Sequence, residues 1–172
     1  RATWLLRSDN DLYGREGQDQ GYTNGFVVTY VSPNVERFDA GCLAAPVRLA
    51  AGTLGWLVPE GEQNNLVLSF QHGTYTPTDG TRADVILDDR PYAGLATLGV
   101  ALNARTGNRL GTTQLRLGMV GPSAQAKFGQ DTLHRWFGRP RFQGWDNQVR
   151  DEVVVQLAHE RAWRRDFAAT AG

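Results

Sequence analysis

The sequence predicts an all-β protein whose strands follow one another in antiparallel order. Six runs of residues alternate between apolar and polar or small side chains, with the period of two that is typical of strands. No run has the spacing of a long amphipathic helix. The 172 residues are enough for one domain with a sizeable core, and their 20 glycines suit strands that are joined by tight turns.

The predicted strands are spread along the whole chain. Residues 2–8 end in a polar cluster, residues 26–31 are β-branched and aromatic, and residues 66–72 alternate clearly. The other three predicted strands are residues 95–102, 113–119 and 153–163. Between the second and third, residues 32–65 are the hardest to interpret. Within them, residues 47–57 are consistent with either a short apolar helix or a loop that packs on the end of the sheet.

Composition excludes several classes of protein. Lys and Arg total 18 and Asp and Glu total 18, which argues against a nucleic-acid-binding protein because that class needs a basic excess. The lone Cys42 cannot form an intrachain disulfide, and we assign it no role. No apolar run reaches the ~18 residues of a membrane-spanning helix. The first residues already resemble a strand, so an export signal is either absent or removed upstream of them.

The alternation leaves two architectures open. A soluble β-sandwich turns the apolar face of each strand inward, whereas a membrane β-barrel turns it outward toward lipid. Periodicity alone does not separate these two architectures.

Strand order predicts where the polar connections meet. If neighbouring strands are antiparallel, the first, third and fifth connections lie at one end of the sheet. These connections are residues 9–22, 73–91 and 121–151, and all three are rich in polar side chains. We therefore expect five residues that are distant in sequence to converge there: Asp11, Thr23, Asp89, Arg90 and His134.

The fifth connection is the first place to look for chemistry. It carries His134 with Gln130 four residues before it, between glycine-proline turns and aromatics. Histidine titrates near neutral pH and can accept and return a proton, although a hydrogen-bonded loop histidine is the plainer interpretation. His72 and His159 follow the apolar faces of strands and are expected to be structural. The sequence contains neither a Gly-x-Ser-x-Gly elbow nor a zinc-like Cys/His cluster.

Oxygen-bearing side chains end the first strand and begin the second. Asn10 and Asp11 suit a Ca²⁺ site, because Ca²⁺ takes oxygen ligands from loops, but an Asx turn is equally consistent with them. Thr23 either donates a hydrogen bond to a substrate or is simply a residue with high strand propensity. In the third connection, Arg82 is a candidate for phosphate binding or an ordinary exposed arginine, and Asp89-Arg90 is consistent with a structural ion pair. The candidate substrate-binding residues are Arg82, Gln130, Asp89 and Arg90.

An ordered set of motifs resembles the lipid A 3′-O-deacylase family of Gram-negative outer membranes. These motifs are Asp9-Asn10-Asp11, Gly21-Tyr22-Thr23-Asn24-Gly25, Tyr75-Thr76-Pro77, Asp89-Arg90-Pro91-Tyr92-Ala93-Gly94, Val120-Gly121-Pro122-Ser123, His134 and Gly144-Trp145-Asp146-Asn147-Gln148. Each motif is weak alone, but the order of the set is specific. The resemblance implies an antiparallel transmembrane β-barrel of outer-membrane type, located in the cell outer membrane.

The resemblance also implies a Ca²⁺-dependent esterase that removes the 3′-linked acyloxyacyl group from lipid A in lipopolysaccharide. By position, the implied active-site residues are Asn10, Asp11, Thr23 and His134, with His134 as general base and Ca²⁺ near Asp11. Arg82 falls where the family places basic residues suited to the phosphates of lipid A. Our own inference is that Gln130 steadies His134 if this segment is helical.

The family's barrel has twelve strands, and six are predicted here. We expect residues 1–172 to form a single β-barrel domain, the N-terminal part of a longer barrel, because open sheet edges are not stable in lipid. Strands from another chain or a different closure are the alternatives. Two other functions remain open: a non-catalytic outer-membrane barrel that binds lipopolysaccharide, and a soluble β-sandwich that binds carbohydrate.

Overall fold

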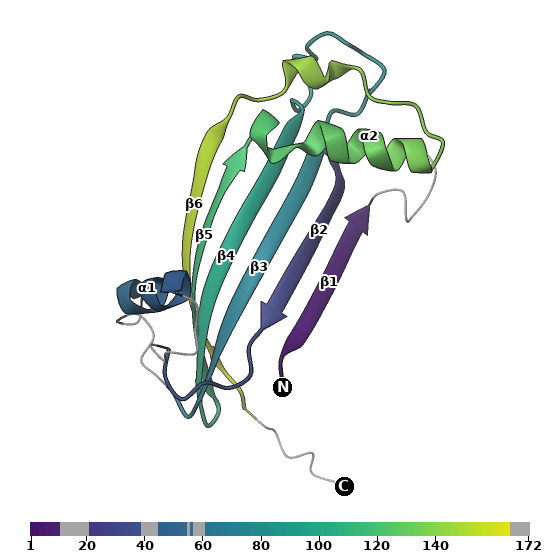
Figure 1. The fold of residues 1–172 in the computed structure, drawn as a ribbon. Coiled ribbons are helices and arrows are strands. Elements are labelled where there is room, and N and C mark those ends of the chain that lie inside the picture. Colours follow the sequence, from purple (N-terminus) through teal and green to yellow (C-terminus); the bar gives the residue numbers. More distant parts are fainter. Residues whose placement is uncertain (11–20, 39–44, 55, 57–60, 166–172) are drawn as a thin grey trace, which may run out of the picture.

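A single antiparallel sheet organises the protein (Figure 1). The computed structural model describes residues 1–10, 21–38, 45–54, 56 and 61–165. Its six strands lie side by side in sequence order, which confirms the predicted all-β antiparallel fold. They are β1 (Thr3–Asn10), β2 (Gly21–Val31), β3 (Gln63–Thr76), β4 (Ala93–Thr106), β5 (Arg109–Val120) and β6 (Glu152–Trp163).

Short helices occupy the connections. Helix α1 (Ala45–Leu54) agrees with the helical alternative for residues 47–57, and α2 (Ala126–Trp136) lies in the fifth connection. Two 3-10 turns, η2 (Pro122–Ala124) and η3 (Gly144–Asn147), flank α2 along the chain. Among the described residues, no helix is both long and apolar enough to cross a membrane.

The strands extend beyond the apolar runs that predict them. The fourth connection, which joins the strands predicted over residues 95–102 and 113–119, is only the turn between Thr106 and Arg109, where Gly107 has a φ of 54°. At the other end of the sheet, β3 continues to Thr76 although its last residues are polar. An antiparallel ladder needs only backbone N–H and C=O groups, so pairing continues where the side-chain alternation has ended.

The register gives the sheet two chemically distinct faces. On the apolar face, directly opposed residues form continuous rows across all six strands. One row is Leu6, Val28, Phe70, Leu98, Leu117 and Val155, and the next is Trp4, Tyr30, Leu68, Val100, Leu115 and Leu157. The other face, the polar face, carries Arg7, Thr29, Ser69, Gln71, Thr97, Gln114 and Arg116.

The polar face is closely packed at its centre. A Cβ added to Gly99 would lie 2.5 Å from Ser69 Oγ and 3.1 Å from Arg116 Cγ. Arg116 Nη1 donates to Gln71 Oε1 at 3.4 Å, so this charged group has a partner within the sheet. Glycine at position 99 therefore leaves room for the Arg116 side chain.

The apolar face is covered at both ends and open between them. At the end that includes the turn after Thr106, Phe38 packs on Leu66 and Leu102. At the opposite end, which we call the cap end, α2 lies across the sheet (Figure 1). Between the covers the rows are exposed, with Leu98 at 67% and Leu6 at 77% relative accessibility.

Candidate functional site

The strand order places three connections at the cap end, as predicted. Asn10 is the last residue of β1, and Thr23 lies in β2 next to Asn24, the residue that pairs with Asn10. Asp89 and Arg90 precede β4, and His134 lies in α2. Asp11, the predicted calcium ligand, is outside the described residues. The described candidate residues therefore lie at the cap end, the end at which the sequence predicts the site.

Small residues let α2 lie close to the apolar face. A Cβ added to Gly94 of β4 would lie 2.7 Å from the Ala126 Cβ and 3.1 Å from the Ala124 Cβ. His72 of β3 donates a hydrogen bond from Nε2 to Ala124 O at 2.9 Å, since a carbonyl oxygen can only accept. His72 is thus a structural contact beneath the start of α2. From there the helix crosses the ends of the strands toward β1 (Figure 1).

The buried stripe of α2 consists of Ala126, Gln130 and His134. Gln130 has no exposed surface and His134 is 4% exposed. Residues four apart share one face of a helix, so both polar side chains are on the buried side of α2. The helical spacing on which our inference about Gln130 depended is therefore present.

A polar row ends the apolar face at the cap end. In register, Asn10 pairs with Asn24, Asn24 with Thr74, and Thr74 with Gly94. We call these four residues the roofed row, because α2 lies over this end of the same face. Asn24 is 8% exposed and Thr74 is fully buried. Thr74 Oγ1 has no hydrogen-bond partner among the described residues, which leaves a buried oxygen available to a ligand.

A β-bulge adjoins the roofed row. Tyr22 pairs with Tyr75 and Asn24 pairs with Thr74, so Thr23 is an extra residue in β2. Bulges twist a strand and change the direction of nearby side chains, and they are common beside active sites. The predicted site residue Thr23 therefore occupies an irregular backbone position rather than a regular strand position.

The hydrogen bond of His134 fixes which ring nitrogen carries the proton. Nδ1 lies 2.6 Å from Pro140 O, and because that carbonyl oxygen can only accept, Nδ1 must be the N–H. In the neutral imidazole, Nε2 then holds the lone pair. The Phe142 ring meets the imidazole edge to face at 5.1 Å and 82°. The ring is thus held in the tautomer that can accept a proton at Nε2.

Trp145 fixes the orientation of Gln130 in the same way. The indole Nε1 only donates, so the amide atom 2.8 Å from it must be the carbonyl oxygen Oε1. Gln130 Nε2 is buried and has no partner among the described residues. Trp145 is 1% exposed, and sequence reasoning gave it no individual role. Its place in the Gly144–Gln148 motif was the only signal, because sequence does not show which aromatic residue meets a buried amide.

Ion pairs and backbone contacts brace the third connection. Arg82 binds Asp84 through Nη2–Oδ2 at 2.5 Å and Nε–Oδ1 at 3.1 Å. Asp89 accepts from the backbone N–H of Thr78 and of Arg90, each at 2.7 Å. These N–H groups, first that of Thr78, lower the pKa of the Asp89 carboxyl. Arg90 Nε lies 3.9 Å from Asp89 Oδ1, so this exposed pair braces the loop.

The third and fifth connections pack into one cap. Gln143 N donates to Gly80 O at 2.9 Å, and Asn147 Nδ2 donates to Ala83 O at 2.7 Å. The rings of Tyr92 and Trp145 lie 4.8 Å apart between the two connections. Through Trp145, the position of Gln130 therefore depends on both segments.

Comparison with known proteins agrees with this architecture. A family model described as "Outer membrane protein LpxR" matches residues 1–171. The chain belongs to the LpxR family. Among solved structures it is similar to LpxR from Salmonella typhimurium, with a TM-score of 0.72 and 15% identity over 99% of this chain and 53% of that chain. The chain thus spans about half the length of that structure. No curated protein matches it.

Membership of the LpxR family confirms the predicted outer-membrane location and resolves the ambiguity of the alternation. The strands of an outer-membrane barrel turn their apolar side chains to lipid and their polar side chains to the interior. The apolar face is accordingly the lipid side of the sheet, and the soluble sandwich is excluded. Helix α2 and the roofed row lie on this lipid side.

Proposed function

We propose that the chain carries the hydrolytic site of a lipid A 3′-O-deacylase, with His134 as the general base. The observation that supports this most is the hydrogen bond from His134 Nδ1 to Pro140 O at 2.6 Å, which leaves Nε2 as the basic nitrogen of a buried ring. The ring belongs to a helix on the lipid side of the sheet, where the esters of a membrane lipid are within reach.

In the proposed reaction, a water molecule attacks the carbonyl carbon of the 3′-linked ester while His134 Nε2 takes one of its protons. The tetrahedral intermediate then expels the 3′ oxygen of the sugar, which receives that proton from Nε2. The products are a free 3′ hydroxyl and an acyloxyacyl acid. Pro140 O holds the ring during both transfers, and Gln130 Nε2 is a donor for an oxygen of the reacting ester.

The residues of the roofed row suit a calcium ion. Asn24 and Thr74 contribute buried amide and hydroxyl groups, and Thr74 Oγ1 has no partner among the described residues. Hard cations prefer such oxygen ligands, so we propose that Asn10 and Asp11 hold Ca²⁺ here, with Thr23 fixing a ligand or the substrate. A bound Ca²⁺ would stabilise negative charge on the ester oxygen.

We propose that Arg82 and Arg90 meet the phosphates of lipid A. Both side chains are exposed on the third connection, at 44% and 55%. Arg82 is held by Asp84, which keeps its guanidinium plane fixed, and a phosphate would share that plane with the carboxylate. Asp89, the other candidate substrate-binding residue of this loop, supports Arg90 through their ion pair.

Mass spectrometry of lipid A from cells that express the protein tests this function. The native protein should remove one acyloxyacyl group, and His134→Ala should leave lipid A intact. His159→Ala is the matched control, because His159 lies on the same face but bonds Thr113 Oγ1 at 2.8 Å, away from the cap. Activity of purified native protein should also be lost with a Ca²⁺ chelator and restored by added Ca²⁺.

Unchanged lipid A in cells that contain folded native protein would refute hydrolysis. That result would favour a non-catalytic barrel that binds lipopolysaccharide. Full activity of His134→Ala would instead remove the proposed base while leaving the reaction in place.

A further inference from the structure

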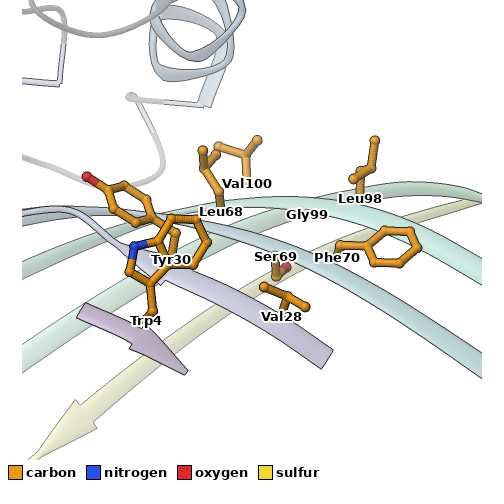
Figure 2. Close-up of a pocket in the computed structure, with 9 residues that line it drawn as sticks. All are labelled: Trp4, Val28, Tyr30, Leu68, Ser69, Phe70, Leu98, Gly99 and Val100. Atoms are coloured by element: carbon orange, nitrogen blue, oxygen red, sulfur yellow. The ribbon is translucent and has the colours of Figure 1, made fainter. Parts of the chain in front are cut away.

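An apolar groove of about 640 Å³ lies on the lipid side of the sheet (Figure 2). Its size is within the range of small-molecule sites, ~300–1,000 Å³. Strands β1 to β4 supply its lining, which consists of Trp4, Val28, Tyr30, Leu68, Ser69, Phe70, Leu98, Gly99 and Val100. Ser69 and Gly99 belong to the polar face, so only apolar residues turn their side chains to the groove, apart from the phenol of Tyr30.

The ends of the groove are set by the two covers of the apolar face. Beyond Leu68 the next residue on this face is Leu66, which is buried under Phe38. Beyond Phe70 the next is His72, which is 9% exposed and bonds Ala124 beside α2. The groove is therefore a bounded hollow rather than part of a uniform lipid-facing surface.

An aromatic pair forms the side of the groove at β1. The rings of Trp4 and Tyr30 lie 5.0 Å apart at an angle of 53°, and Figure 2 shows them side by side. Trp4 is 70% exposed, so its ring is available to apolar material that occupies the groove. No charged side chain lines the groove.

The groove leads toward the roofed row along β2. Val28 lines the groove, Phe26 follows on the same face, and Asn24 belongs to the roofed row. At ~3.3 Å per residue, Val28 and Asn24 are separated by about 13 Å along the strand. Phe26 is 39% exposed, so an apolar surface connects the groove with the roofed row. The helix α2, which contains His134, runs toward this side of the sheet.

We propose that the groove binds one acyl chain of the lipid whose ester is cleaved under α2, and thereby selects substrates by chain length. The inference rests on the proposed function. A hydrocarbon chain suits the groove because it has no polar atoms to satisfy, whereas a peptide backbone would lose hydrogen bonds there. The cover at Phe38 limits how much chain is accommodated at one end, and at the other end the exposed Phe26 on β2 leads on to the site.

Two variants with the same substitution in one row test this inference. Val28→Trp places an indole in the groove, whereas Val155→Trp changes the same residue type in the same row on β6, outside the groove. The purified proteins are assayed on p-nitrophenyl butyrate and p-nitrophenyl laurate. Val28→Trp should lower the laurate-to-butyrate ratio of kcat/KM by about tenfold or more, and Val155→Trp should leave it unchanged.

Binding gives a second measurement that does not depend on hydrolysis. The same proteins in amphipol are titrated with cis-parinaric acid, a fluorescent fatty acid. Val28→Trp should weaken binding about tenfold relative to native protein and to Val155→Trp. Equal binding of the fatty acid by native protein, Val28→Trp and Val155→Trp would refute the proposal that the groove holds an acyl chain. Equal laurate-to-butyrate ratios of kcat/KM in the three proteins would refute it too. If the native protein binds the fatty acid but cleaves no ester, the proposed function fails while the groove stands.

Discussion

Replacing Trp145 with phenylalanine removes one N–H from the cap and keeps most of an aromatic ring. The lost bond is the 2.8 Å contact from Trp145 Nε1 to Gln130 Oε1. Both side chains are almost completely buried, so water cannot replace the donor. A buried acceptor left without a partner costs ~1–3 kcal/mol, which makes opening of the cap about 5- to 160-fold more frequent.

Amide hydrogen exchange along α2 measures this opening directly, because exchange there requires the helix to leave the sheet. Trp145→Phe should exchange faster by that factor at Gln130 and its neighbours. Trp136→Phe is the control, since Trp136 also lies in α2 but is 75% exposed. Activity should fall in Trp145→Phe, because Gln130 Nε2 would lose its fixed direction.

A double variant separates the hydrogen bond from the packing. Gln130→Leu with Trp145→Phe removes both polar partners, so no buried acceptor is left unpaired. Its exchange rates should return toward native values while its activity stays low. Equal exchange in Trp145→Phe and Trp136→Phe would refute the argument that the indole N–H holds Gln130.

Two further predictions concern how the cap is held. Gly94→Ala should force α2 away from the sheet, because the new Cβ would lie 2.7 Å from the Cβ of Ala126. Its activity should fall by about tenfold or more. Gly111→Ala is the control and should be tolerated, because its Cβ would meet only Ala104 O at 3.9 Å. The lowered pKa of Asp89 means that its carboxylate stabilises the loop above the usual carboxyl pKa of 3.8 and ceases to do so as pH falls through the lower folded value. The protection factor of the Thr78 amide, which is the measured exchange rate corrected for the pH dependence of unprotected amides, should therefore fall in acid in native protein, and Asp89→Asn should abolish that dependence.

The sequence predicted the strands because each lipid-facing residue must be apolar while its neighbours need not be. That requirement produces the alternation through Leu66, Leu68 and Phe70 and its counterparts in the other strands. Parity then placed His134 at the same end as Asn10, since six antiparallel strands leave no other arrangement of their connections.

The cap was predicted less well, because its contacts join segments that are distant in sequence. Two of the three buried residues of α2, Gln130 and His134, are polar, so a search for a buried apolar stripe does not identify this helix. The link from Trp145 to Gln130 depends on where η3 lies relative to α2, which no local pattern encodes. The strand ends were missed because their side chains are polar even though their backbones are paired.

Under the proposed function, the position of α2 on the lipid side of the sheet has a consequence for how the substrate lipid reaches it. A molecule that diffuses sideways within the leaflet would arrive with its tails still in hydrocarbon. Arrival from the aqueous phase would instead require pulling those tails into water, at ~0.8 kcal/mol for every methylene. Lateral arrival avoids that barrier, so turnover would depend on the two-dimensional density of lipid around the protein rather than on its concentration in solution.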